Sequence, residues 1–290
     1  MLKNVQNLII TAPAKVNLHL AVLERRPDGF HNLESVFLAL DFADTLFFEP
    51  FDQENALEID MKTGSVPIPA EKNIIFRTIS LFRAKTGFFQ GLRVKVEKRI
   101  PIGGGLGGGS SNAASTLLAL NKLASSPLNR DSLLEMGASL GSDIPFFLRE
   151  IPAAKVTGRG ECIEPIDIPR LFLVLVNPGF HSDTAAAYRL LDKKREGEKI
   201  ASSKAPENGI AFNSFWNDFL PVFEEPEKSV YNDIIAQLEE IGAEYANLSG
   251  SGSTCFGVFY DRAKAEKAAV VLRDKWSFSE FCCSYKKLSM

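Results

Sequence analysis

The sequence is poor in cysteine, in long apolar runs and in excess charge. Its four cysteines, Cys162, Cys255, Cys282 and Cys283, show no CxxC spacing, which argues against a zinc knuckle or a redox pair. The longest aliphatic and aromatic run is residues 171–176, whereas a membrane-spanning helix needs about 20 residues. The N-terminus also lacks the apolar length of a secretion signal. We therefore expect a cytoplasmic protein with reduced, mostly buried thiols and no membrane partner.

The charge is nearly balanced, since 33 basic and 36 acidic residues leave a net charge of −3. A groove for long nucleic acid usually needs a positive surplus, so a nucleic-acid polymer is not the expected partner. The balanced charge does not exclude a local basic pocket for a small anionic ligand. Hydrophobic residues make up 45% and charged residues 24% of the chain, which excludes a disordered or fibrous protein. The length of 290 residues corresponds to about two domains.

Hydrophobic periodicity predicts an α+β chain in which strands and helices mix. Residues 16–22 are predicted to form a half-buried strand, and Asp41 and Asp44 are expected to break the next apolar stretch in two. Asn73 and Asp131 are the expected N-caps of two helices, and Gly87 is expected to end the first of them. The other predicted elements are strands at 35–40, 45–49, 92–96, 171–176, 244–248, 254–260 and the C-terminus, and helices at 74–85, 111–124, 132–140, 213–223, 229–241 and 262–275.

A stretch punctuated by prolines, IEPIDIPR at residues 163–170, is the expected joint between two domains, 1–165 and 166–290. Residues 192–209 are the least core-like part of the sequence, so they are predicted to form a solvated loop or a flap.

The most informative segment is PIGGGLGGGSSNAAS, residues 101–115, which has six glycines in seven positions. So many residues without a Cβ atom cost conformational entropy, and packing alone explains them poorly. The run lies between a predicted strand and a predicted helix, where glycine amides and a helix N-terminus can hold phosphate. Ser110 or Ser111 is expected to cap the helix, contact phosphate or bind Mg²⁺.

Three familiar phosphate loops are excluded. The chain has no Gly-Lys pair, which a Walker loop requires, and it has neither HRD nor DFG, the signatures of protein kinases. A dinucleotide fold would need a second strand that ends in an acid about 20 residues later, and SSPLNRDSLLEMG stands there instead. The segment therefore indicates a phosphate-binding loop of another class.

Four ordered segments resemble the motifs of the GHMP kinases, a family of small-molecule kinases. They are APAKVNL at 12–18, the glycine run, LGSDIPFF at 140–147 and LSGSGSTCF at 248–256. The resemblance implies an ATP-dependent transferase with two α+β domains and the active site in the cleft between them. The N-terminal domain would be like ribosomal protein S5 domain 2, and the C-terminal domain a ferredoxin-like α/β sandwich.

The segment RPDGFH, residues 26–31, is similar to one branch of that family. This branch phosphorylates the 2-hydroxyl of 4-diphosphocytidyl-2-C-methyl-D-erythritol, a cytidine-diphosphate-linked polyol of isoprenoid biosynthesis. The alternatives are a GHMP kinase for homoserine or mevalonate, and a non-catalytic ligand sensor on the same scaffold. The small acceptors have no base for His31 to bind, and a sensor should have lost Lys15 or Asp143. A monomer or a weak homodimer is the expected state.

The resemblance also implies roles for individual residues. Asp143 would orient or deprotonate the acceptor hydroxyl, and Lys15 would lie within salt-bridge reach of it. ATP would be held by Asn73, Lys98 and the loop residues Pro101, Ile102, Gly103, Gly104, Gly105, Leu106, Gly107, Gly108, Gly109, Ser110 and Ser111, with Mg²⁺ near Ser111. The substrate would be bound by Asn17, Phe30, His31, Tyr188, Gly250, Ser251 and Gly252.

Each assignment has a plainer structural alternative. Lys15 can be a solvated lysine at a strand end, Asp143 and Asn73 can be helix caps, and Tyr188 can be a helix-core residue. His19 is expected to be structural. Phe30 stands where the family usually has tyrosine, and it can stack but cannot donate a hydrogen bond.

Overall fold

The computed structural model describes residues 7–61, 69–196 and 212–286, which form two compact units. The first unit comprises residues up to 14, 43–100 and 107–150, and the second comprises 15–42, 101–106 and 151 onward. The expected joint near residue 165 lies inside the second unit, which is continuous from residue 151 onward. The domain boundaries 1–165 and 166–290 stay a prediction. The solvated loop or flap predicted at 192–209 is wrong for its first residues, because 192–194 form the last turn of helix α5 (Thr184–Lys194). From residue 197 on, the predicted segment lies outside the described residues.

The first unit combines four α-helices with part of a β-sheet. Strand β4 (Gly91–Glu97) pairs antiparallel with the second half of β2 (His31–Phe51) and parallel with β3 (Leu57–Met61). The helices pack against one another, with α2 in contact with the other three. They are α1 (Ile74–Thr86), α2 (Gly108–Leu123), α3 (Arg130–Leu140) and α4 (Ile144–Leu148), preceded by the 3₁₀ turn Ala70–Lys72.

The predicted ends of α1 are confirmed. The Asn73 side chain accepts a hydrogen bond from the Ile75 amide, and Gly87 ends the helix with φ 69°. For α3 the prediction was wrong, because Asn129 rather than Asp131 caps the helix by accepting from the Ser132 amide. Asp131 lies in the first turn, where its negative charge favours the helix N-terminus.

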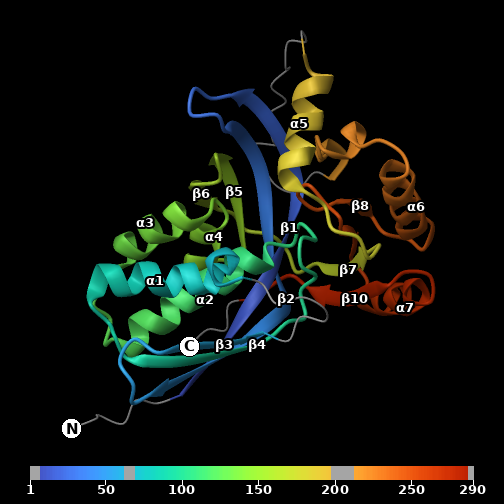
Figure 1. Cartoon of the computed structure of the whole chain (residues 1–290). Helices are drawn as coiled ribbons and strands as arrows, with labels where there is room; N and C mark the ends of the chain where they lie inside the picture. Colours follow the sequence, from blue (N-terminus) through green and yellow to red (C-terminus); the bar gives the residue numbers. More distant parts are fainter. Residues whose placement is uncertain (1–6, 62–68, 197–211, 287–290) are drawn as a thin grey trace. The chain divides into compact units, whose positions relative to one another are not determined.

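The second unit contains a four-stranded antiparallel sheet in the order β10-β7-β9-β8. Helices α6 (Glu227–Glu240) and α7 (Arg262–Arg273) pack on it, and Figure 1 shows them beside the sheet. This order and the β-α-β-β-α-β succession are those of a ferredoxin-like fold, so that expectation is confirmed. The strands are β7 (Phe172–Asn177), β8 (Tyr245–Leu248), β9 (Cys255–Phe259) and β10 (Phe278–Cys283).

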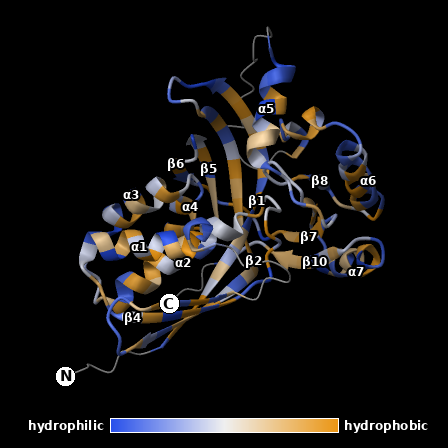
Figure 2. Ribbon diagram, viewed as in Figure 1, coloured by the Kyte–Doolittle hydropathy of each residue, from blue (hydrophilic) through white to orange (hydrophobic). Residues whose placement is uncertain are grey.

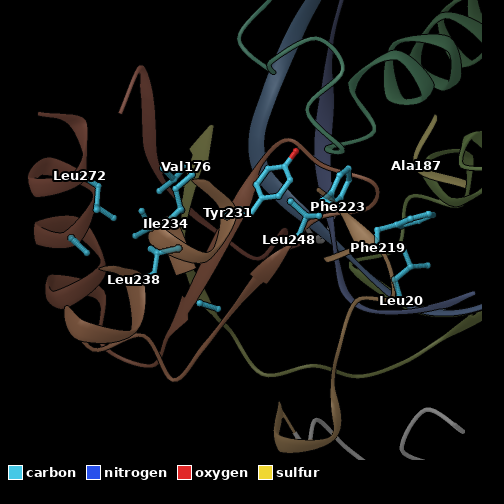
Figure 3. Close-up of a cluster of buried hydrophobic side chains, with 14 of the residues drawn as sticks. Leu20, Val176, Ala187, Phe219, Phe223, Tyr231, Ile234, Leu238, Leu248 and Leu272 are labelled. Atoms are coloured by element: carbon cyan, nitrogen blue, oxygen red, sulfur yellow. The ribbon is translucent and has the colours of Figure 1, made fainter. Parts of the chain in front are cut away.

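The core of the second unit lies between this sheet and its helices. Figure 3 shows Val176, Leu248, Ile234, Leu238 and Leu272 gathered in it. In Figure 2 strand β7 is drawn almost entirely in the hydrophobic colour, whereas α6 and α7 carry both colours, as helices with one buried face do. The unit also contains β5 (Ala153–Gly158), β6 (Cys162–Pro165) and α5 (Thr184–Lys194).

Strands β1 (Leu8–Arg25) and β2 are longer and more buried than predicted. Asn17, His19 and Ala21 are buried together with the apolar residues between them, so residues 16–22 are not half-exposed. Asp41 and Asp44 do not break β2, because both carboxylates accept backbone hydrogen bonds, Asp41 from Cys283 and Asp44 from residues 99 and 100.

The helix predicted at 213–223 is absent from the described chain. Two 3₁₀ turns stand there, Phe212–Ser214 and Leu220–Val222. Between them the backbone bonds to β1, with the Leu20 amide donating to the Trp216 carbonyl at 2.9 Å and the Asp218 amide to the Leu20 carbonyl at 3.0 Å. Tertiary pairing therefore overrides the helical periodicity.

The cysteines are free thiols, and all except Cys162 are buried, as expected. Burial raises the pKa of Cys255 and of Cys282, which disfavours the reactive thiolate.

Candidate active site

The glycine loop is tied to the second unit through its carbonyl groups. Four consecutive carbonyl oxygens each accept a hydrogen bond from another residue of that unit. They are Gly103 from the Ser182 amide at 3.5 Å, Gly104 from the Thr254 amide at 3.1 Å, Gly105 from the Ser249 hydroxyl at 2.9 Å and Leu106 from the Lys15 amide at 3.0 Å. The loop conformation is therefore built into the folded unit rather than left to a ligand.

This conformation requires glycine at alternate positions. Gly103, Gly105 and Gly107 have φ values of 67°, 74° and 68°, which side chains with a Cβ rarely adopt. A Cβ atom on Gly105 would lie 2.0 Å from the Ser249 carbonyl oxygen, so the close approach of two backbones also excludes it.

Within the described residues no backbone N–H from Gly103 to Ser110 donates a hydrogen bond, and the first donor of α2 is Ser111, which bonds to Gly107. Successive free amides in a loop with alternating φ, followed by a helix N-terminus, are a site for an anion such as phosphate. The loop can therefore hold phosphate through its backbone, without a basic surface.

The two serines of the run are not caps. The N-cap of α2 is Gly107, so Ser110 and Ser111 lie inside the first helical turn, and the capping expectation was wrong. Ser111 is fully buried, and its Oγ has no hydrogen-bond partner among the described residues. A buried hydroxyl is normally paired, so this oxygen is suited to a phosphate or to a magnesium ion bound with it.

Lys98 and Asn73 both lie in the first unit. The Lys98 ammonium forms an ion pair with Asp44, whose carboxylate is fully buried and also accepts from the amides of residues 99 and 100 at 2.8 and 2.9 Å. A Cβ on Gly108 would lie 3.3 Å from this ammonium, so Lys98 stands at the start of α2. Asn73 serves as the cap of α1, and its contact with ATP stays a prediction.

Lys15 is buried, which excludes a solvated strand-end lysine. Its Nζ donates to Asn17 Oδ1 at 2.5 Å and lies 4.8 Å from the centre of the Phe37 ring. Asn17 also donates to the Ser35 hydroxyl at 2.9 Å and, through its backbone, to Ser249 at 3.3 Å. These contacts hold the Lys15 ammonium beside the Asn17 side chain and tie Asn17 to Ser249.

Asp143 occupies the N-cap position of α4, yet its side chain makes no capping hydrogen bond in the described structure. The simple helix-cap interpretation is therefore insufficient. Asp143 belongs to the first unit and Lys15 to the second, so the pairing predicted between them stays a prediction.

The PDGFH segment forms a turn at which Asp28 accepts from the Phe30 amide at 3.2 Å. Half of the Phe30 side chain is exposed, and the Arg159 guanidinium packs 4.8 Å from the centre of its ring. The His31 ring stacks on Tyr188, with centroids 5.2 Å apart and planes at 20°. The structure thus brings together two of the residues that the resemblance assigned to substrate binding.

Three neighbours of these sites were not identified from the sequence. Asp192 hydrogen-bonds to His31, and the Arg159 guanidinium packs on the Phe30 ring. The His181 ring lies against Gly103, where an added Cβ atom would be 1.6 Å from Nδ1 of His181. Only Asp192 left a signal, because it follows Tyr188 by four residues and so shares its helix face.

The loop at 249–253 is held by hydroxyl groups of its own unit. Ser251 bonds through its carbonyl to the Ser182 hydroxyl at 2.5 Å and through its own hydroxyl to Thr184 at 2.9 Å. Gly250 and Gly252 have φ values of 59° and 89°. Substrate contacts by these three residues stay a prediction.

Two features are absent from residues 7–61, 69–196 and 212–286. None of their helices combines the length and apolar character needed to cross a bilayer. They also contain no cluster of three or more His, Cys, Asp or Glu side chains arranged to hold a metal.

Comparison with known proteins agrees with this geometry. Residues 73–150 match the N-terminal domain of the GHMP kinases, and residues 198–277 match their C-terminal domain. The 4-diphosphocytidyl-2-C-methyl-D-erythritol kinase of Thermodesulfovibrio yellowstonii is 38% identical over 93% of this chain and 95% of its own length. That of Syntrophus aciditrophicus is 36% identical over 95% of this chain and 98% of its own length.

Solved structures lead to the same group. A crystal structure of 4-(cytidine 5'-diphospho)-2C-methyl-D-erythritol kinase superposes with a TM-score of 0.77 and 31% identity, over 96% of this chain and 100% of that one. A homoserine kinase from Cytophaga hutchinsonii shares the fold, with a TM-score of 0.64 and 17% identity over 98% of this chain and 96% of its own. With this identity along nearly its whole length, the chain belongs to the GHMP kinase family, in the group of the 4-diphosphocytidyl-2-C-methyl-D-erythritol kinases.

Proposed function

We propose that this chain is an ATP-dependent kinase that phosphorylates the 2-hydroxyl of 4-diphosphocytidyl-2-C-methyl-D-erythritol. The observation that carries the phosphoryl-transfer part is the row of amides from Gly103 to Ser110 that donate no hydrogen bond to any described residue, in a loop held by four bonded carbonyls. Phosphoryl transfer asks a protein mainly to position groups and to stabilise negative charge, which such a loop does without a strong base.

The catalytic roles fall to two charged residues. Asp143 orients the acceptor hydroxyl and takes its proton, which leaves late in a loose transition state, so an ordinary carboxylate suffices. The Lys15 ammonium, a point charge buried beside Asn17, stabilises the negative charge that develops on the transferring group.

The chain's residues also fit a magnesium ion bound together with ATP. The Ser111 hydroxyl in the first turn of α2, which has no partner in the described part of the chain, would hold it, since Mg²⁺ takes few protein ligands and several phosphate oxygens. The ion would neutralise phosphate charge during transfer.

The stacked His31 and Tyr188 favour the cytidylyl substrate over homoserine or mevalonate. An aromatic ring pair with a histidine nitrogen suits a flat heterocyclic base, which the two smaller acceptors lack. The sensor alternative is disfavoured because both Lys15 and Asp143 are present.

Purified protein with MgATP and the cytidylylated methylerythritol should release ADP in proportion to phosphorylated product. Homoserine and mevalonate should not support release above the background without acceptor. No ADP with any of the three acceptors would favour the sensor, and release with mevalonate alone would assign the chain to another substrate. A monomer or weak homodimer in the cytoplasm is the associated expectation, which sedimentation of the purified chain and cell fractionation would check.

A further inference from the structure

His31 is held by two side chains of helix α5. Its ring stacks on Tyr188, and its Nε2 lies 2.8 Å from Oδ1 of Asp192. Tyr188 and Asp192 are four residues apart, so both lie on one side of the helix. The histidine side chain keeps only 8% of its surface exposed, whereas Asp192 keeps 40%. The contact joins residues that are 161 positions apart in the chain.

The helix that carries Asp192 is fixed at both ends. At its start Asp183 accepts from the amides of residues 185 and 186, at 2.8 and 3.1 Å. At its end Arg195 donates to a carbonyl of β1 at 2.6 Å and pairs with Asp218 at 2.8 Å. Leu191, beside Asp192, is buried in the core of the second unit. The carboxylate is therefore presented to His31 from a rigid support.

The partner decides which ring nitrogen of His31 carries the proton. A carboxylate only accepts hydrogen bonds, so the nitrogen that faces it, Nε2, must be the donor. In the neutral ring the other nitrogen, Nδ1, then has a free lone pair and can only accept.

We propose that Asp192 is a positioning residue that holds His31 with Nδ1 as an acceptor, and thereby selects a pyrimidine with an amino group over one with a carbonyl group. This inference rests on the proposed function, which makes a cytosine base part of the substrate. Cytosine offers an amino donor at N4, where uracil offers the O4 acceptor. A lone pair that faces another acceptor repels it, whereas a ring free to exchange its proton between the nitrogens accommodates both bases.

The first test is the protonation pattern of His31 in the free protein. The chain has only three histidines, so ¹⁵N NMR of the imidazole nitrogens is simple, and His31→Gln assigns the signal. At neutral pH we expect the Nε2–H form in the unsubstituted protein. Asp192→Ala should give a mixture of both forms. Glu196→Ala, which removes an exposed carboxylate just beyond the same helix, should leave the signal unchanged. The Nδ1–H form in the unsubstituted protein, or an unchanged pattern in Asp192→Ala, overturns the inference.

The second test is binding of CDP and UDP, measured by calorimetry without any reaction. We expect the unsubstituted protein and Glu196→Ala to prefer CDP, and Asp192→Ala to lose about tenfold of that preference. Equal affinity for both nucleotides, binding of neither, or an undiminished preference in Asp192→Ala overturns the inference. Failure of the kinase assay alone would refute the proposed reaction, while the histidine signal and the CDP preference would still decide the role of Asp192.

Discussion

The Ser249 hydroxyl donates a hydrogen bond to the Gly105 carbonyl at 2.9 Å and accepts one from the backbone N–H of Asn17 at 3.3 Å. One fully buried side chain thus joins the glycine loop to the strand that carries Lys15. The link connects three segments that are separate motifs in the sequence, at 12–18, 101–115 and 248–256.

Ser249→Ala should therefore weaken ATP binding. Loss of one buried hydrogen bond costs about 1 kcal/mol, so we expect the KM for ATP to rise about fivefold. Steady-state kinetics would measure this change. Ser279→Ala is the matched control, because Ser279 is equally buried and donates to the Ala269 carbonyl at 3.0 Å away from the loop. A KM that rises equally in both variants would show that the effect is only structural.

Two glycines of the loop should respond oppositely to alanine. Gly105→Ala places a Cβ 2.0 Å from a backbone oxygen at φ 74°, so we expect the free energy of unfolding to fall by about 2–4 kcal/mol. Gly109 lies within α2, and its nearest contact is Ile74 at 4.0 Å, so Gly109→Ala should be neutral or stabilising by up to about 1 kcal/mol. Urea unfolding compares the two. Equal stability of Gly105→Ala and the unsubstituted protein would contradict the loop conformation.

Asp143→Asn should keep the fold and reduce turnover. An amide cannot take the hydroxyl proton, and general-base groups contribute about a hundredfold or more to rate. We expect kcat to fall by about that factor, with circular dichroism unchanged. Asp131→Asn removes an exposed carboxylate of the same unit and should leave kcat intact. Near-normal turnover of Asp143→Asn would remove this residue from catalysis.

Stability should depend on pH through His19. Burial lowers the pKa of His19 from 6.5 to about 4, and its Nδ1 accepts from the Trp216 amide. Between these two pH values His19 is protonated in the unfolded chain and neutral in the folded chain. The folded state therefore loses stability as the pH falls from about 6.5 to 4. The loss is about 2–3 kcal/mol.

His19→Gln keeps an acceptor oxygen but does not titrate, so its stability should vary less over this window. Urea midpoints at pH 7 and pH 4.5 would measure the difference between the two proteins. Identical pH dependence would show that other groups are responsible.

Local signals predicted the elements whose ends are determined by neighbouring residues. The Asn73 cap, the Gly87 stop and the helices α6 and α7 are confirmed, because capping and periodicity act within a few residues. The errors occur where distant groups intervene. Residues 213–223 hydrogen-bond to β1 instead of forming the predicted helix. Asp44 accepts hydrogen bonds from the backbone of residues 99 and 100 and does not break β2.

The sequence by itself determined the chemistry of the loop. Six glycines between a strand and a helix have few uses besides phosphate, and the motifs around them identify the family. Only the tertiary structure decided which carbonyls of the loop are bonded, that Ser111 is buried with no partner among residues 7–61, 69–196 and 212–286, and that Asp192 faces His31. The bonded carbonyls and the contact between Asp192 and His31 join residues far apart in the chain, up to 161 positions, and no periodicity or local propensity spans such a separation. Packing of whole elements sets them.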